Sequence, residues 1–341
     1  MKTALVTGFT GQDGTFLTRL LLDKGYKVIG LCRRVSTEPP RRVRGKFDFT
    51  VELGSEQLVL ADGDLLSVSS LNRILRDYQP DEIYNLAWQS HVGLSFKTPE
   101  VSLRDYEGYV NLITAVETVC PKARIYQAST SEMYGDRDES TQLNEMTPLR
   151  PNSPYAIAKT AAHFYGQMKR KASYKQPGMF ISNGILFNHE SEIRGGDFVT
   201  MKIARGAKTW AETGEPIHLG NLEAKRDWGY AGDYVEGMWL MLQHHEPGDF
   251  VLATGETNTI RKFAEKAFEV LGYELVSNGL NGVDEVLSVN NKPAIVIDPQ
   301  FYRPNEVGYL LGDATKAWSE LHWKPKHDFR SLVEVMVKAA S

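Results

Sequence analysis

The sequence predicts a doubly wound α/β fold, in which a parallel sheet is covered by helices on both faces and is followed by a smaller C-terminal α/β lobe. Short apolar runs alternate with longer amphipathic runs through the first half of the 341 residues. The short runs are continuous stretches rich in Val, Ile and Leu, which is typical of strands buried on both faces. From about residue 188 this rhythm breaks, and glycine, tryptophan and charged residues become denser.

The first lobe is expected to contain five strands separated by helices. Helices are predicted over residues 12–25, 67–79 and 103–120. Strands are predicted over residues 2–8, 27–34, 56–65, 81–87 and 123–130.

The second lobe is expected to be smaller and mixed. Helical patterns cover residues 198–210 and 233–243, and strand-like segments cover residues 249–254 and 294–299. We expect a first domain over residues 1–187 and a second mainly over residues 188–341, with crossovers of the chain back to the first.

The bulk composition is that of a globular protein with no unusual bias. Lys and Arg number 39 and Asp and Glu number 43, for a net charge of −4, so nothing suggests a nucleic-acid partner. No apolar run approaches the roughly 18 residues that cross a bilayer, and glycine interrupts the N-terminal run too early for a signal peptide. Two cysteines, Cys32 and Cys120, form no disulfide framework. We therefore expect a cytoplasmic protein.

A glycine-rich loop follows the first strand. Gly8, Gly11 and Gly14 form a G-x-x-G-x-x-G spacing directly before the first helix. Glycine there lets the backbone approach a pyrophosphate, which the free N–H groups of the helix N-terminus attract. Glycines are also common in ordinary turns, but the position between the first strand and first helix favours a dinucleotide site of the Rossmann type.

The end of the second strand bears on which dinucleotide is bound. An NAD site usually has an acidic residue there, whereas Arg33 and Arg34 stand here with no acid before Glu38. We expect NADP, although two solvated arginines would give the same pattern. Asp64 and Leu65 end the third strand, where they either face the adenine side or form the turn before a helix.

A tyrosine and a lysine are spaced four residues apart on a predicted helix. Tyr155 and Lys159 follow Ser153 and Pro154, which are favourable residues for a helix start. An i, i+4 pair shares one helix face, and a lysine ammonium near a phenol is expected to lower the phenol pKa from about 10. Chance also produces this spacing, but after the glycine loop we interpret Tyr155 as a base.

Together these residues resemble the extended short-chain dehydrogenase/reductase family. A longer series of segments, spread over nearly the whole chain, resembles the GDP-mannose 4,6-dehydratases within it. The segments are GFTGQDG (8–14), DEIYNLAWQSHV (81–92), YQASTSEMYG (126–135), RPNSPYAIAK (150–159), NGILFNHES (183–191), AKRDWGYAGDYVEGMW (224–239), ATGET (253–257) and FYRPNEVGYLLGD (301–313).

The resemblance implies a lyase that oxidises C4 of a hexose, eliminates water across C5 and C6, and reduces C6 with the same hydride. The C4 ketone acidifies the C5 hydrogen, so a nearby carboxylate can remove that proton and then protonate the departing hydroxyl. The resemblance gives this role to Glu132, which otherwise would cap the turn after the strand. It assigns Thr130 a hydrogen bond to the C4 oxygen, Tyr155 the C4 hydroxyl proton, and Lys159 contacts with Tyr155 and the nicotinamide ribose.

Further site residues are implied by the same resemblance, and no metal is implied. Each of them alone could equally belong to a surface or structural ion pair. The cofactor-contacting positions are Gly8, Phe9, Thr10, Gly11, Gln12, Asp13, Arg33, Arg34, Ser36, Asp64, Leu65, Leu86, Ala87, Gln89, Ser90, Tyr155, Lys159, His189 and Arg194. The positions implied for a GDP-sugar are Ser90, Glu132, Asn183, Lys202, Asn221, Arg226, Arg303 and Glu306.

Several segments depart from the family pattern. Trp88 replaces a small residue next to the expected nicotinamide, and Val101 stands where many members have tyrosine. The loop between Glu132 and Tyr155 is one residue longer than is typical. The basic residues between 41 and 46 either help to build a tetramer around NADP, as a similar loop does in the family, or form a solvated loop. We expect a homo-oligomer, either a dimer or a tetramer.

Three alternatives to GDP-mannose dehydration stay open. A GDP-heptose 4,6-dehydratase would keep the chemistry and change the sugar. A nucleotide-sugar 4-reductase or epimerase would not require the acid at Glu132. An NADP-sensing regulatory protein on the same fold usually lacks the tyrosine–lysine pair, which is present here.

Overall fold

The computed structural model describes residues 1–33, 56–138, 141–171, 178–301 and 307–340. Its larger lobe is built on a seven-stranded sheet in which every neighbouring pair is parallel. The strand order is β11-β6-β5-β4-β1-β2-β3. The chain adds β2 and β3 on one side of β1 and then β4, β5 and β6 on the other, which is a doubly wound arrangement with its switch point between β1 and β4. The strands are β1 (Thr3–Thr7), β2 (Lys27–Cys32), β3 (Leu58–Asp62), β4 (Glu82–Asn85), β5 (Arg124–Thr130), β6 (Ile181–Leu186) and β11 (Asp249–Leu252).

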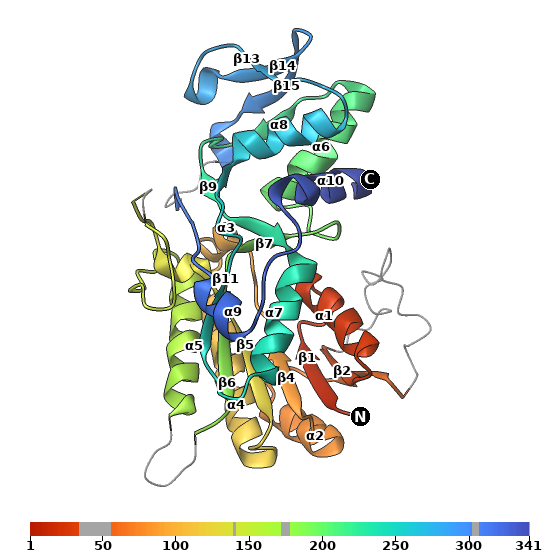
Figure 1. The fold of residues 1–341 in the computed structure, drawn as a ribbon, viewed down its shortest axis with the longest axis vertical. Coiled ribbons are helices and arrows are strands. Elements are labelled where there is room, and N and C mark those ends of the chain that lie inside the picture. Colours follow the sequence, from red (N-terminus) through yellow and green to blue (C-terminus); the bar gives the residue numbers. More distant parts are fainter. Residues whose placement is uncertain (34–55, 139–140, 172–177, 302–306, 341) are drawn as a thin grey trace.

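Helices cover both faces of this sheet (Figure 1). On one face α2, α4 and α5 pack side by side, and on the other α1 packs against α7. Each helix turns an apolar stripe toward the strands, so the sheet separates two buried hydrophobic clusters. These helices are α1 (Gln12–Asp23), α2 (Val68–Tyr78), α4 (Pro99–Val119), α5 (Pro154–Arg170) and α7 (Ala231–Gln243). The doubly wound parallel fold predicted from the sequence is confirmed.

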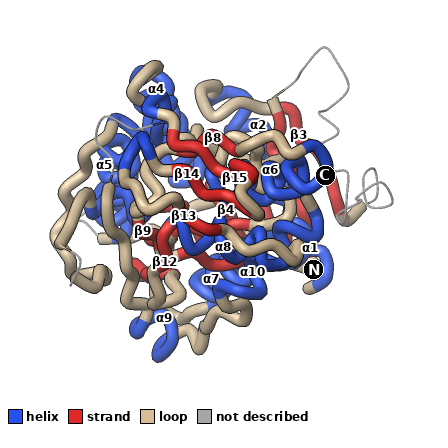
Figure 2. The backbone as a smooth tube through the Cα atoms, turned by 90° about the horizontal axis from the view of Figure 1, so that it is seen from above, coloured by secondary structure: helices blue, strands red, loops and turns tan. Residues whose placement is uncertain are grey.

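A smaller lobe lies beyond one end of the strands (Figure 1). Its four-stranded mixed sheet has the order β13-β14-β15-β8, and α6, α8 and α10 pack on one another beside it. Figure 2 looks down on this lobe and shows β8, β14 and β15 as one small sheet. Its elements are α6 (Val199–Thr213), β8 (Ile217–Leu219), α8 (Ile260–Val270), β13 (Val276–Ser277), η2 (Gly282–Asp284), β14 (Val286–Val289), β15 (Lys292–Ile297), η3 (Pro299–Phe301) and α10 (Phe329–Ala339).

Short elements connect the two lobes. Two strand pairs lie where the chain passes from one lobe to the other: β7 pairs with β10 in parallel, and β9 pairs with β12 in antiparallel orientation. These strands are β7 (Asn188–Glu190), β9 (Lys225–Arg226), β10 (Trp228–Tyr230) and β12 (Asn258–Thr259). The remaining short elements, α3 (Val92–Ser95), η1 (Ser131–Tyr134) and α9 (Thr315–Glu320), pack on the larger lobe. The chain returns to the larger lobe through α7 and β11, so the division at residue 188 stays a prediction.

Candidate active site

The glycine loop leaves no space for side chains where it meets the sheet. Gly8 has φ +66°, and a Cβ there would lie 2.7 Å from the backbone N of Ala87. A Cβ on Gly14 would lie 2.3 Å from the carbonyl oxygen of Gly8. Gly11 precedes α1 and supplies no side-chain cap, so the first N–H groups of α1 are open to an anion. These features fit the pyrophosphate of a dinucleotide.

The next loop is held close to this glycine turn by Thr7. The Oγ1 atom of Thr7 accepts hydrogen bonds of 3.1 Å from the backbone N–H groups of both Leu86 and Ala87. The backbone N–H of Gln89 donates to Asp105 at 2.9 Å. The stretch from Leu86 to Ser90 therefore follows β4 in a fixed conformation beside the glycine loop.

The outer cofactor positions divide into described and undescribed residues. Arg33 is exposed directly after β2, whereas Arg34 and Ser36 lie outside the described residues. The carboxylate of Asp64 accepts from the backbone N–H of Leu66 at 3.0 Å, which corresponds to the turn alternative. Leu65 packs against Gly108 of α4.

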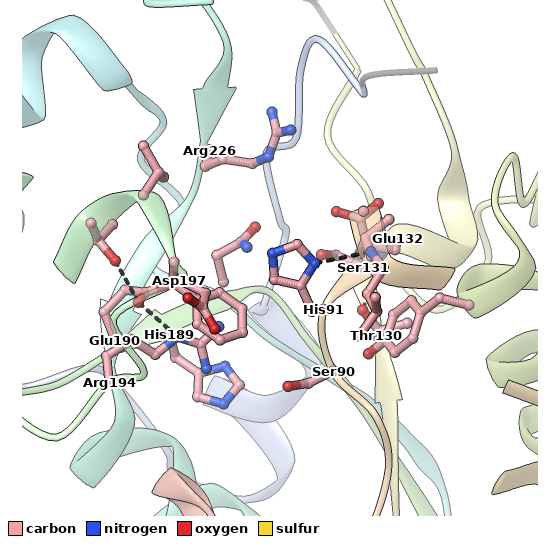
Figure 3. A pocket seen from close by; sticks show the side chains of 18 of the residues that line it. Ser90, His91, Thr130, Ser131, Glu132, His189, Glu190, Arg194, Asp197 and Arg226 are labelled. Carbon is pink, nitrogen blue, oxygen red and sulfur yellow. Dashed lines mark hydrogen bonds and ion pairs between the residues drawn. The ribbon is translucent and has the colours of Figure 1, made fainter. Parts of the chain in front are cut away.

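A cavity of about 900 Å³ lies where the two lobes meet at the ends of β4, β5 and β6. In Figure 3, Thr130, Ser131 and Glu132 stand together at the end of β5, and Arg226 approaches from the smaller lobe. Twelve of the residues proposed from the sequence line this cavity: Asp13, Leu86, Ser90, Thr130, Glu132, Tyr155, Lys159, His189, Arg194, Lys202, Asn221 and Arg226. Those that do not line it include Phe9, Thr10, Gln12 and Ala87. Arg303 and Glu306 lie outside the described residues.

Tyr155 and Lys159 are both buried on α5. Ser153 caps this helix by accepting from the backbone N–H of Ala156 at 3.1 Å, and Pro154 begins it. Lys159 Nζ donates to the carbonyl oxygen of Ala128 at 2.8 Å and lies 4.2 Å from the ring centroid of Trp88. Burial lowers the pKa of Lys159 to about 7, against the attraction of Asp105 and Asp13.

The pKa of Tyr155 is raised, whereas the sequence led us to expect a lowered value. Burial raises the pKa of Tyr155 well above its ordinary value, and the negative charge of Glu132 adds to this effect. A hydrogen bond with Thr130 opposes the rise. Lys159 Nζ is 5.8 Å from the ring centroid of Tyr155 and is engaged with Ala128, so its charge does not overcome burial.

Glu132 reaches the cavity from the short helix η1 that ends β5. The cap of η1 is Thr130, whose Oγ1 accepts from the backbone N–H of Glu132 at 3.3 Å. The side chain of Glu132 therefore does not act as the cap, which excludes the alternative considered for it. Glu132 is only 8% exposed, and it shares the cavity with Thr130 and Tyr155.

His189 joins the glycine loop to β7 through a charged pair. Its Nδ1 lies 2.8 Å from the carbonyl oxygen of Phe187, and its Nε2 lies 2.9 Å from Asp13 Oδ2. Both ring nitrogens face acceptors, so the doubly protonated ring satisfies both. Burial favours neutral groups, but the pair's attraction raises the pKa of His189 and lowers the pKa of Asp13. Gln12 strengthens this connection by donating to the carbonyl oxygen of His189 at 3.0 Å.

Cationic side chains form the wall nearest the smaller lobe. Arg194 Nε lies 3.0 Å from Glu190 Oε2, and the Arg194 guanidinium lies 3.5 Å from the ring centroid of Phe198. Lys202 Nζ lies 3.4 Å from the ring centroid of Phe301, and burial lowers the pKa of Lys202. Arg226 also lines this cavity, and the donors of arginine and lysine side chains match the oxygens of a diphosphate.

The structure places Asn183 away from the cavity in which a substrate contact is expected for it. This residue is fully buried in β6, where its Nδ2 donates to Asp249 Oδ1 at 2.8 Å and to the carbonyl oxygen of His163 at 3.3 Å. It does not line the cavity. Asn188, at the start of β7, does so, and its buried Oδ1 has no hydrogen-bond partner in the described part of the chain. Both asparagines occur in the segment NGILFNHES, of which only Asn183 was named from the sequence.

Other cavity residues were not found from the sequence. His91, Lys97, Glu190 and Asp197 line the cavity in addition to Asn188. They lie in loops or short elements, where no periodicity marks a side chain as facing a site. Within the described residues no cluster of three His, Cys, Asp or Glu side chains could hold a metal ion, and no helix there is long and apolar enough to span a membrane.

Comparisons with known proteins agree with the sequence motifs. The family model described as GDP-mannose 4,6 dehydratase matches residues 5–336. A GDP-mannose 4,6 dehydratase of Drosophila melanogaster is 46% identical over 99% of this chain and 86% of its own length. A GDP-mannose 4,6-dehydratase of Sinorhizobium fredii (strain HH103) is 45% identical over 99% of this chain and 96% of its own length. The human GDP-mannose 4,6 dehydratase is 45% identical over 98% of this chain and 90% of its own length.

Solved structures with lower sequence identity share the fold. A dTDP-glucose 4,6-dehydratase from Bacillus anthracis, in complex with NAD, aligns with a TM-score of 0.79 at 19% identity, covering 99% of this chain and 96% of that one. A UDP-glucose 4-epimerase from Thermus thermophilus, also in complex with NAD, aligns with a TM-score of 0.77 at 23% identity, covering 99% and 98%. By its family model and its full-length relatives, the chain belongs to the GDP-mannose 4,6-dehydratase family.

Proposed function

We propose that this protein is a GDP-mannose 4,6-dehydratase, a lyase that converts GDP-α-D-mannose to GDP-4-dehydro-6-deoxy-α-D-mannose and water with bound NADP. One observation carries the proposal. Glu132 shares a single cavity with Thr130, Tyr155 and Lys159. A simple nucleotide-sugar reductase or epimerase would use the last three residues without a carboxylate at the strand end.

The dinucleotide would lie along the glycine loop. Its pyrophosphate would meet the open N-terminus of α1, and the residues after β4 would form the opposite side. When bound, it supplies a hydride acceptor for C4 and returns the same hydride to C6. The residues proposed to hold it are Gly8, Phe9, Thr10, Gly11, Gln12, Asp13, Leu86, Ala87, Gln89, Ser90, Tyr155, Lys159, His189 and Arg194.

Tyr155 would begin the reaction as the base for the C4 hydroxyl. Its raised pKa keeps the phenol protonated in the free protein, so loss of the proton would depend on the positive charge of Lys159, which opposes the effect of burial. Thr130, already hydrogen-bonded with Tyr155, is placed to share the C4 oxygen. Because the pKa of Lys159 is about 7, its charge is lost in mildly alkaline solution unless a bound ligand raises that pKa.

Glu132 would carry out the elimination. With a ketone at C4, the C5 hydrogen is acidic, and the Glu132 carboxylate takes it as a proton. The resulting carboxylic acid gives a proton to the C6 hydroxyl, which leaves as water as the C5–C6 double bond forms. This transfer regenerates the Glu132 carboxylate. When C6 is reduced, C5 would take a proton from solvent, which balances the proton released from the C4 hydroxyl through Tyr155. One buried side chain thus acts first as base and then as acid.

The nucleotide part of the substrate would lie toward the smaller lobe. Lys202 and Arg226 supply positive charge for the diphosphate, and Asn221 lines the same end of the cavity. We add Asn188 to the proposed substrate contacts, because its amide oxygen is buried without a partner in the described residues. The contributions of Arg303 and Glu306 stay predictions.

The cofactor type, assembly and compartment are also proposals. Arg33 follows β2 where an NAD site would have an acid, which supports NADP. A homo-oligomer is supported by an apolar stripe on α5, where Ile157, Phe164 and Met168 are each more than half exposed. These residues share one helix face, and such exposed stripes commonly mark protein contacts. We propose a dimer or tetramer in the cytoplasm.

The experiment that tests the function uses the purified protein, GDP-mannose and NADP. Mass spectrometry should detect loss of one water from the sugar nucleotide, and absorbance should show no net reduction of the dinucleotide. Stoichiometric reduction without loss of water would instead indicate a dehydrogenase. GDP-heptose in a parallel reaction tests the alternative sugar, and faster dehydration of GDP-heptose would overturn the assignment of mannose.

A further inference from the structure

A chain of hydrogen bonds runs from the partly buried side of the larger lobe to the cavity. It links Arg170, Asp249, Gln167, His163 and Ser129, and we call it the Ser129 chain. Three of these residues lie on α5, while Ser129 is on β5 and Asp249 begins β11. Tyr155 and Lys159 belong to the same helix, so the chain fixes α5 against the strand that carries Thr130.

The chain has an ionic anchor. Arg170 Nη2 donates to Asp249 Oδ1 at 2.5 Å, and Arg170 Nε donates to the carbonyl oxygen of Ile181 at 2.7 Å. Burial favours the neutral carboxyl, but the hydrogen bonds from Arg170 and Gln167 hold the pKa of Asp249 below its ordinary value. Asp249 is therefore an ionised acceptor, and Gln167 Nε2 donates to its Oδ2 at 2.7 Å. The reverse orientation would set the amide oxygen of Gln167 against a carboxylate.

This anchor determines which nitrogen of His163 carries hydrogen. Gln167 Nε2 also lies 3.1 Å from His163 Nε2, so this ring nitrogen must accept. Burial lowers the pKa of His163, which keeps the ring neutral near pH 7. A neutral ring that accepts at Nε2 carries its hydrogen at Nδ1. That Nδ1 lies 3.0 Å from Ser129 Oγ, so the ring donates and the serine oxygen accepts.

The direction of this last bond leaves the Ser129 hydrogen for another acceptor. Ser129 lines the cavity and is 5% exposed. Its Oγ makes no other hydrogen bond to the residues that the structure describes. Its neighbours on β5 are Ala128, whose carbonyl oxygen holds Lys159, and Thr130, which bonds Tyr155. A buried hydroxyl donor beside reacting groups costs stability unless a bound molecule accepts its hydrogen.

We propose that Ser129 donates a hydrogen bond to a carbonyl oxygen of a molecule bound in the cavity, and that His163 is the positioning residue that directs it. The proposal rests on the proposed function, under which two carbonyl oxygens enter the cavity. One belongs to the carboxamide of the nicotinamide, and the other is the ketone formed at C4 of the sugar. Both are hydrogen-bond acceptors of the same chemistry, and the experiment distinguishes them.

The first comparison replaces serine with alanine at two buried sites. Ser129→Ala removes the proposed donor, whereas Ser182→Ala removes a buried hydroxyl from the adjacent strand β6, outside the cavity. For each variant, fluorescence titration gives the NADP dissociation constant, and single-turnover absorbance gives the rate of hydride transfer from GDP-mannose. Loss of one hydrogen bond should change one of these quantities by about three- to tenfold for Ser129→Ala and by less than twofold for Ser182→Ala.

The two arms separate the possible acceptors. A larger NADP dissociation constant in Ser129→Ala identifies the nicotinamide carboxamide as the acceptor. An unchanged dissociation constant with slower hydride transfer identifies the C4 ketone. If Ser129→Ala changes neither quantity, the proposal is wrong. If native protein binds NADP but leaves GDP-mannose unchanged, the proposed function fails, and the dissociation constants still decide whether Ser129 contacts the dinucleotide.

The second comparison tests the direction imposed by His163. In His163→Asn the side-chain amide nitrogen can replace Nδ1, whereas in His163→Gln it reaches the Nε2 position. Ser129→Ala should change either the NADP dissociation constant or the rate of hydride transfer. We expect that quantity to stay near its native value in His163→Asn and to change in His163→Gln as much as it does in Ser129→Ala. Thermal unfolding of both variants separates folding defects from this pattern. When His163→Gln is combined with Ser129→Ala, that quantity should change no further than in Ser129→Ala alone. If His163→Gln caused the same change with and without Ser129, His163 would act independently of Ser129.

Discussion

Replacing Lys159 with methionine should remove the contribution that titration of Lys159 makes to the pH dependence of the unfolding free energy. Lys159 is 4% exposed, and burial lowers its pKa from the ordinary 10.5 to about 7. Between these two values the unfolded chain binds a proton that the folded chain has released. Stability therefore rises with pH across this window, and below pH 7 the folded protein bears the full cost of a buried ammonium.

The magnitude follows from the two pKa values. Each pH unit within the window is worth about 1.4 kcal/mol, so the two units between the folded pKa and pH 9 give about 3 kcal/mol. The native protein should accordingly gain about 3 kcal/mol of unfolding free energy between pH 6 and pH 9 relative to Lys159→Met. Other groups that titrate in this range are common to both proteins and cancel in the difference.

The assay is urea unfolding of both proteins at several pH values, without cofactor or sugar. Lys169→Met is the matched control, because Lys169 lies on the same helix and pairs with Glu117 at 2.7 Å near the surface. The control should follow the native protein closely over the whole range. If the difference between native protein and Lys159→Met were the same at pH 6 and pH 9, Lys159 would have an ordinary pKa and the argument from burial would be refuted.

Three further predictions concern the site. Tyr155→Phe should retain NADP binding but slow the first hydride transfer by at least about a hundredfold, since general bases contribute that much, and unchanged single-turnover reduction would contradict the assignment. Gly8→Ala should abolish tight dinucleotide binding. Gly25→Ala is the control, because Gly25 has φ +78° but no atom lies within 4 Å of the added Cβ. This control should bind the dinucleotide normally, although the substitution should lower the free energy of unfolding by about 1–2 kcal/mol. If both variants bound the dinucleotide equally well, close approach of the Gly8 backbone to the pyrophosphate would not be required. NADP should bind more tightly than NAD, and Arg33→Ala should narrow that difference; equal calorimetric affinities in native protein would be the opposing result.

Regular elements of the first lobe could be predicted well because their patterns are local. Continuous apolar runs predicted β1 and β2, and an amphipathic pattern predicted α4. β6 was missed, although all six of its residues are buried, because Asn183 and Gly184 interrupt its apolar run. α8 was also missed, although its apolar residues recur at helical spacing. β11 was recognised as a strand, but its place beside β6 depends on pairing between distant segments, which no local pattern specifies.

The site shows the same limit. The motifs around Thr130, Glu132 and Tyr155 predicted residues that do share one cavity. Asn183 was named from the sequence, but it lies outside the cavity because strand bounds decide which side chains emerge from the sheet. The Tyr155 pKa was misjudged because burial is a property of the packed molecule and opposes the lysine charge. The departure at Trp88 was noticed in the sequence, but its contact with the Lys159 ammonium required the structure.

Glu132→Gln tests the central claim most directly. The proteins are incubated with NADP and GDP-mannose in deuterated water, and both the reduced dinucleotide and the sugar mass are followed. Glu145→Gln is the control, because this carboxyl lies outside the cavity and the glutamine oxygen can still accept from the backbone N–H of Val251. Native protein and control should release water and place solvent deuterium at C5, while Glu132→Gln should reduce the dinucleotide, hold a 4-keto sugar and release no water. Dehydration by Glu132→Gln at a near-native rate would contradict the account.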